Sequence, residues 1–146
     1  MKKIVYILPI LILVVLSACK KEVSPANTSH QNTHATSDLD GKWNLVHLYG
    51  GIAGINENYA SGEIEWTFNT QNATLTVNNT VGNSSYYSLP SGTYPFQQIS
   101  NSNQNYLVID ANELGQFVIS GNQIFIDENK KSTGEGACGF YMELER

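Results

Sequence analysis

The chain has 146 residues, with 13 acidic and 8 basic side chains and a formal net charge of −5 at pH 7. A protein this acidic, with no basic stripe, is not expected to bind nucleic acid. The same charge argues against electrostatic docking on anionic lipid.

The first 18 residues have the layout of a secretory signal peptide. Lys2 and Lys3 form a basic start, and residues 4–16 are apolar apart from Pro9, which disfavours a helix. This run is shorter than the roughly 20 residues that a membrane-spanning helix needs, so we expect it to be cleaved. Cleavage would remove two lysines and no acid, leaving a net charge of −7.

The end of this segment, Leu16-Ser17-Ala18-Cys19, resembles the lipobox of bacterial lipoproteins. The resemblance implies that Cys19 becomes the first mature residue and carries acyl chains such as palmitate on its thiol and amine. Two or more acyl chains give lasting membrane anchorage, at about 0.8 kcal/mol for each buried CH₂. The alternative is an ordinary signal peptide followed by a coincidental cysteine.

The residues after Cys19 indicate location and domain organisation. Lys20 and Lys21 differ from the acidic residue of an inner-membrane retention signal, so we expect the outer membrane of the cell envelope, with either face possible. Residues 19–37 are rich in Ser, Thr, Asn, Gln and His and contain few apolar side chains. We therefore expect a lipidated cysteine and disordered tether over 19–37, and a folded domain over 38–146.

Strand signals occur throughout the expected domain. Ile64, Trp66 and Phe68 alternate with polar residues, which is the clearest period-two pattern in the chain. Turn residues separate this strand from residues 73–77, so the two are expected to form a hairpin. A second hairpin signal joins residues 117–119 to residues 124–126 through Gly121 and Asn122.

Further strands are expected at 42–49, 106–109 and 138–145, with one that begins at Tyr94 and Phe96 and a weaker one near Tyr86 and Tyr87. About eight or nine short strands with no persistent helical period predict an all-β fold, either a sandwich or a barrel. An antiparallel eight- to nine-stranded barrel would close the hydrogen-bond ladder and leave no exposed sheet edge.

Two connections have distinct patterns. Residues 50–59 combine three glycines with Ile52, Ile55 and Tyr59, and they form either a mobile lid over a cavity or a long hairpin whose apolar residues cap the core. Residues 130–136 are polar and glycine-containing, so we expect a loop before the last strand.

Gly41-Lys42-Trp43, at the start of the domain, resembles the Gly-x-Trp opening of the lipocalin family. The resemblance, which is to the short lipocalin-like domains of bacterial lipoproteins, implies that Trp43 lies near the closed end of a barrel and that a basic side chain of the last strand covers its ring. Arg146 has the strand parity for that role, and such a cation–π pair contributes about 0.5–2 kcal/mol. Alternatively, Trp43 is a core aromatic residue of another β fold.

We expect no enzymatic activity, no cofactor and no metal site. The chain has no phosphate loop, Cys-x-x-Cys or His-Glu-x-x-His motif. Cys138 follows the apolar alternation of the last strand and is expected to be buried, although a thiol–imidazole pair with His47 is an alternative. Glu63 and Glu65 have the parity of a solvated strand face.

These patterns lead to a hypothesis about function. We expect a monomeric, membrane-anchored lipoprotein whose lipocalin-like barrel binds a small apolar or amphipathic ligand. Trp66, Phe68, Tyr94 and Phe96 are expected to line the pocket. The alternative is a structural or protein-interaction envelope lipoprotein with a solid barrel, in which exposed tyrosines such as Tyr86 and Tyr87 contact a partner.

Overall fold

The structure is a computed structural model that describes residues 36–81 and 88–146. Cys19, most of the expected tether and the expected strand near Tyr86 and Tyr87 lie outside the described residues. The described chain contains the helix α1 (Thr36–Leu39) and the strands β1 (Gly41–Gly50), β2 (Ile55–Asn58), β3 (Ile64–Asn69), β4 (Thr74–Asn79), β5 (Gly92–Asn101), β6 (Gln104–Ile109), β7 (Asn112–Ser120), β8 (Gln123–Asp127), β9 (Lys130–Lys131), β10 (Gly134–Glu135) and β11 (Phe140–Glu145). No helix among these residues is long and apolar enough to cross a membrane.

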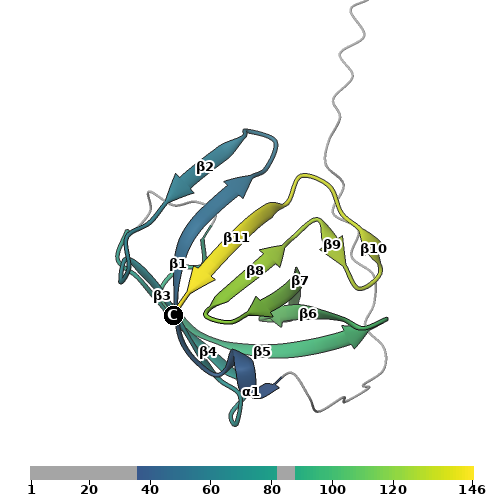
Figure 1. The fold of residues 1–146 in the computed structure, drawn as a ribbon, viewed down its shortest axis with the longest axis horizontal. Coiled ribbons are helices and arrows are strands. Elements are labelled where there is room, and N and C mark those ends of the chain that lie inside the picture. Colours follow the sequence, from purple (N-terminus) through teal and green to yellow (C-terminus); the bar gives the residue numbers. More distant parts are fainter. Residues whose placement is uncertain (1–35, 82–87) are drawn as a thin grey trace, which may run out of the picture.

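Eight of the strands close into an antiparallel barrel (Figure 1). They follow the order β11-β8-β7-β6-β5-β4-β3-β1, and β11 then pairs with β1 from Asn44↔Glu145 to Gly50↔Phe140. β2 is a ninth strand, added beside the second half of β1. The predicted all-β antiparallel barrel is therefore confirmed.

Both hairpins expected from the sequence are present. β3 pairs with β4 from Ile64↔Asn79 to Asn69↔Thr74, and β7 pairs with β8 up to Ser120↔Gln123. In the first turn the Asn72 backbone N–H donates to Asn69 Oδ1 at 3.0 Å. This is the local side-chain hydrogen bond that favours asparagine in turns.

Residues 50–59 form a hairpin, the second of the two interpretations above. β1 continues to Gly50, and residues 51–54 turn the chain back into β2. Ile55 and Tyr59 pack against the core, whereas Ile52 at the tip is 77% exposed.

The expectation of a loop over residues 130–136 is wrong in part, because β9 and β10 pair there as a small hairpin. Lys131 Nζ donates to the backbone carbonyls of Glu113 and Leu114, and the Glu113 carboxylate accepts hydrogen bonds from Ser132. These contacts with β7 are long-range, so the local polar composition did not reveal the hairpin.

The barrel interior is filled by one cluster of buried apolar side chains. Its members are Leu39, Trp43, Leu45, Leu48, Ile64, Trp66, Phe68, Leu75, Val77, Phe96, Leu107, Ile109, Phe117, Ile124, Ile126, Met142 and Leu144. Period-two alternation sends these residues inward on each strand. On β1 the register against β11 shifts between Leu45 and His47, so Leu48 returns to the core after one extra residue.

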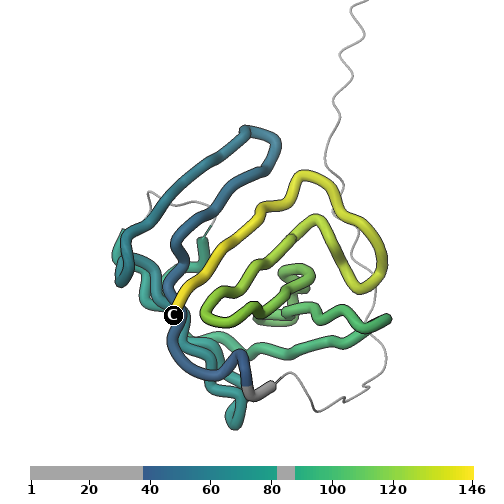
Figure 2. Tube along the Cα trace, in the orientation of Figure 1, coloured from purple at the N-terminus to yellow at the C-terminus, as the bar shows by residue number. Residues whose placement is uncertain are grey.

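The C-terminus lies beside the start of β1, as the tube in Figure 2 shows. The Arg146 guanidinium carbon lies 4.0 Å from the centroid of the Trp43 ring, so the contact expected for these two residues is present. Arg146 Nη2 also donates to the backbone carbonyls of Asp38 and Asp40, and Trp43 Nε1 donates to the carbonyl of Leu39 at 2.8 Å. Arg146 therefore ties the last strand to the segment that precedes β1.

Cys138 does not lie on the buried face of the last strand, so that expectation is wrong. The side chain is exposed, and the residue has a positive φ of 67° just before β11 begins at Phe140. At the adjacent Gly139, an added Cβ would lie only 2.7 Å from Glu128 Cβ. This close packing and the left-handed residue interrupt the alternation that the sequence suggested.

Replacing Arg146 by alanine is expected to lower the free energy of unfolding by about 1–2 kcal/mol, because the cation–π contact and the charged hydrogen bonds are lost. Urea unfolding at neutral pH measures the change. Lys42→Ala is the control, since Lys42 makes an exposed 2.8 Å ion pair with Glu65 that is worth less than about 1 kcal/mol. Equal losses in both variants would contradict a special role for Arg146.

Candidate ligand-binding site

Three of the four aromatic residues predicted to line a pocket meet inside the barrel. Trp66 and Phe68 point inward from β3, with ring centroids 6.1 Å apart. Phe96 points inward from β5 and meets Phe68 edge-on, with centroids 5.2 Å apart. All three side chains are at most 5% exposed, so they belong to the packed core.

Tyr94, the fourth predicted residue, occupies a different environment. Its ring is half-buried and packs against the edge of the core, opposite Leu75 of β4. Its hydroxyl donates to the carbonyl of Pro90 at 2.8 Å. The Tyr94 hydroxyl hydrogen is therefore already donated to a carbonyl of the loop that precedes β5.

Two buried N–H groups on the inward faces of these strands lack acceptors. Within the described chain, Trp66 Nε1 and Gln98 Nε2 are buried and have no hydrogen-bond partner. Trp43 Nε1, by contrast, donates to Leu39 O. A buried donor without an acceptor costs about 1–3 kcal/mol, and folded proteins retain few of them.

Gln98 was missed as a candidate in the sequence analysis. It shares the inward parity of β5 with Tyr94 and Phe96, while Gln97 and Ile99 point outward. The sequence predicted a strand that begins with Tyr94 and Phe96, but its later residues were not assigned to a face. Continuing the period-two alternation for one more step would have placed Gln98 on the same face.

Glu128 is a half-buried carboxyl group where β8 meets the start of β11. Its backbone N–H donates to Phe140 O at 2.9 Å, and its Oε2 accepts from Phe140 N–H at 3.0 Å. Burial raises the pKa of Glu128, while the Phe140 hydrogen bond and the charge of Lys131 act in the opposite direction. Gly115 permits the close packing here, since an added Cβ would lie 2.2 Å from Asp127 O.

His47 points outward from β1. Its ring stacks on Tyr49 with centroids 4.6 Å apart, its Nδ1 lies 3.6 Å from Glu143 Oε1, and its Nε2 lies 2.7 Å from Asn56 Oδ1. Both ring nitrogens therefore have partners on the outer surface.

Among residues 36–81 and 88–146, no group of three His, Cys, Asp or Glu side chains is placed to hold a metal ion. Comparison of the chain with protein-family models, with curated proteins and with solved structures finds no match.

Glu128→Gln is expected to change how stability depends on pH. Folding raises the pKa of Glu128 above its ordinary value of 4.5, so the folded state favours the protonated carboxyl. The wild-type domain therefore loses stability from this group as the pH rises from 4.5 through the folded-state pKa. Glutamine keeps an acceptor for Phe140 N–H but cannot ionise.

Urea unfolding of both proteins at a series of pH values from about pH 4 upward measures this difference, because the contribution of Glu128 is lost as its carboxyl ionises in the folded state. We expect the free energy of unfolding of Glu128→Gln, relative to that of the wild-type protein, to increase as the pH rises. The same difference at all pH values would show that the ionisation of Glu128 is not coupled to folding.

Proposed function

We propose that the protein is a lipoprotein that is anchored to a cell-envelope membrane through acylated Cys19 and binds a small amphipathic ligand inside its barrel. The lipobox-like Leu16-Ser17-Ala18-Cys19 supports the anchor. The closed barrel and the Gly41-x-Trp43 opening are compatible with a lipocalin-like domain. The absence of the inner-membrane retention signal after Cys19 favours the outer membrane.

The observation that carries the ligand proposal is the pair of buried donors, Trp66 Nε1 and Gln98 Nε2. A ligand oxygen that accepted a hydrogen bond from either donor would recover most of the cost of leaving that donor unpaired. The ring contacts from Trp66 through Phe68 to Phe96 provide an apolar surface beside these donors. An eight-stranded barrel holds either a filled core or one small ligand. Apolar side chains fill this interior, so the proposal requires them to shift to admit the ligand.

The ligand class follows from this arrangement. Two N–H donors select an acceptor such as a carboxylate or a carbonyl oxygen, and the surrounding rings and aliphatic side chains select an apolar tail. A fatty-acid-like molecule combines both features. We propose that Tyr94, which packs partly buried against the core, contacts the ligand as it enters.

The ligand proposal is tested by titrating the chain from residue 20 onward with dodecanoate and following tryptophan fluorescence. We expect saturable binding, and we expect Gln98→Leu to weaken it by about tenfold, equivalent to about 1.4 kcal/mol. The same variant should not lower the free energy of unfolding, because it removes an unpaired buried donor. A loss of binding without a loss of stability distinguishes a ligand contact from a packing role.

The matched control is Gln97→Leu, since Gln97 is the exposed neighbour on the outward face of β5. It should leave the affinity for dodecanoate unchanged. Failure of the wild-type protein to bind a series of fatty acids, while remaining folded and β-rich, would sink the ligand proposal.

The anchor is tested separately by expression of the full chain in a bacterium that acylates lipoproteins, with a labelled palmitate analogue. The chain contains two cysteines, so Cys138→Ala is the matched control for Cys19→Ala. We expect label and membrane association to disappear only in Cys19→Ala. Label that persists in this variant would contradict acylation at Cys19.

A further inference from the structure

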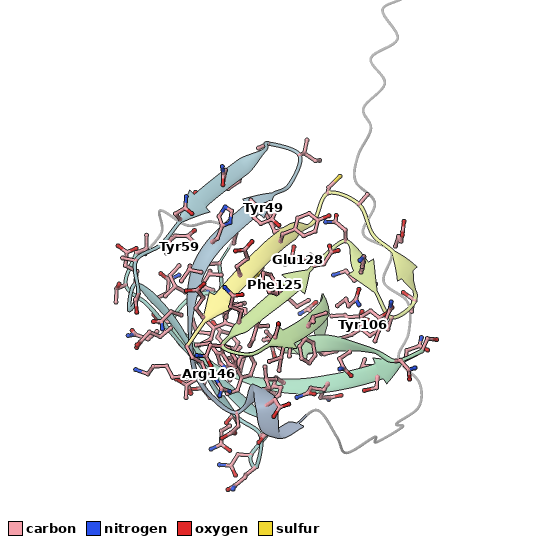
Figure 3. All side chains as sticks on the ribbon, in the orientation of Figure 1. Tyr49, Tyr59, Tyr106, Phe125, Glu128 and Arg146 are labelled. Atoms are coloured by element: carbon pink, nitrogen blue, oxygen red, sulfur yellow. The ribbon has the colours of Figure 1, made fainter. Side chains whose placement is uncertain are left out.

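A pocket lies on the outside of the barrel, across strands β1, β11, β8 and β7. It has a volume of about 210 Å³ and is lined by Tyr49, Gln116, Val118, Phe125, Ile126, Asp127, Lys130 and Tyr141. We call it the outer pocket. Figure 3 labels Tyr49 and Phe125, which lie on either side of β11.

Strand register explains why these side chains meet. Tyr141 on β11 is opposite Tyr49 of β1 on one side and Asp127 of β8 on the other, and Val118 of β7 is opposite Phe125 of β8. Directly opposed residues of antiparallel strands share a face. The rings of Tyr49 and Tyr141 stack with centroids 5.1 Å apart and an interplanar angle of 13°.

The outer pocket brings together three of the large apolar side chains that are exposed on the barrel surface. Val118 is 52% exposed, Phe125 39% and Tyr141 38%. Clustered exposed apolar side chains of this kind mark interaction sites more often than isolated ones do. The pocket is smaller than the roughly 300–1,000 Å³ of sites for drug-sized ligands, so it suits a single side chain of a partner.

The charges around the outer pocket favour a cation. Asp127 lines the pocket, and the carboxylate of Glu143 lies on the neighbouring outward position of β11. Burial raises the pKa of Tyr49, and the charges of Glu143 and Asp127 raise it further, as expected in a negative environment. Aromatic ring faces add to the attraction because they attract cations electrostatically.

Lys130 is the cation already present beside the outer pocket. Its Nζ lies 3.7 Å from Asp127 Oδ2, and its side chain is 54% exposed. The Asp127 side chain is 19% exposed, so the pair is partly open to solvent. Solvent-screened pairs contribute about 1 kcal/mol or less, so a better-placed cation can displace Lys130. The pair also shows that an ammonium group fits beside this carboxylate.

We propose that the outer pocket binds a lysine or arginine side chain presented by a basic partner polypeptide. The aliphatic stem of the incoming side chain packs on Val118 and Phe125, and its charged head meets Asp127 and the face of Tyr141. The net charge of −5 for the whole chain steers a basic partner toward the domain. The outer pocket faces away from the barrel interior, so this binding does not depend on the ligand proposed above.

The test uses the chain from residue 20 onward and fluorescein-labelled hexalysine, with binding followed by fluorescence anisotropy in about 0.15 M salt, where general charge effects are screened. We expect Asp127→Asn to weaken binding about tenfold. We also expect Tyr141→Leu to weaken binding, because leucine keeps an apolar side chain but removes the aromatic ring face. Glu145→Gln is the matched control, because it also removes one exposed negative charge from this face of the barrel, outside the pocket.

Equal weakening by Asp127→Asn and Glu145→Gln would show general charge attraction and overturn the proposal. No binding of hexalysine by the folded wild-type protein would overturn it as well. Tighter binding of a neutral oligosaccharide, such as an N-acetylglucosamine hexamer, that is lost in Tyr141→Leu would assign the pocket to sugars instead.

Discussion

The pairing of β1 with β11 is the constraint on which the rest of the structure depends. A sheet of eight strands has two edges with unpaired backbone groups, and this pairing removes both of them. Arg146 secures the junction, because its guanidinium covers Trp43 while it donates to the carbonyls of Asp38 and Asp40. Trp43 in turn donates to Leu39, so one small cluster joins both ends of the folded chain at one end of the barrel.

Closure divides every strand into an inward and an outward face, and the two faces have different properties. Inside, apolar side chains fill the core, and the donors of Trp66 and Gln98 are the polar groups left unpaired there within the described chain. Outside, Tyr49 and Tyr141 stack beside Asp127 in the outer pocket. The two proposed sites therefore lie on opposite faces of the same sheet.

Much of this fold could be predicted from the sequence, because the strongest signals are local. The alternation through Ile64, Trp66 and Phe68 and the turn residues of both hairpins depend on neighbours along the chain, and the structure follows them. The contact between Trp43 and Arg146 came from a family resemblance together with strand parity. The remainder depends on contacts between distant segments. Residues of β7 hold the β9–β10 hairpin in place, and close packing at Gly139 displaces Cys138 from the last strand. The outer pocket requires the register of four strands. The packed interior also decides which inward-facing polar groups lack a hydrogen-bond partner. Strand alternation could therefore place Gln98 on the inward face, but it could not show that its side-chain N–H group has no acceptor.

The most direct test of the central claim is the response of the two tryptophan indole N–H signals in a ¹H–¹⁵N spectrum to dodecanoate. The chain has two tryptophans, and the structure gives them opposite roles: Trp43 Nε1 is bonded to Leu39 O, whereas Trp66 Nε1 is buried without an acceptor. If a ligand oxygen binds inside the barrel, the Trp66 indole signal should move downfield and saturate with added dodecanoate, while the Trp43 signal stays in place. If neither signal moves, or if only that of Trp43 responds, the barrel does not hold its ligand at Trp66 and the account of the interior is wrong.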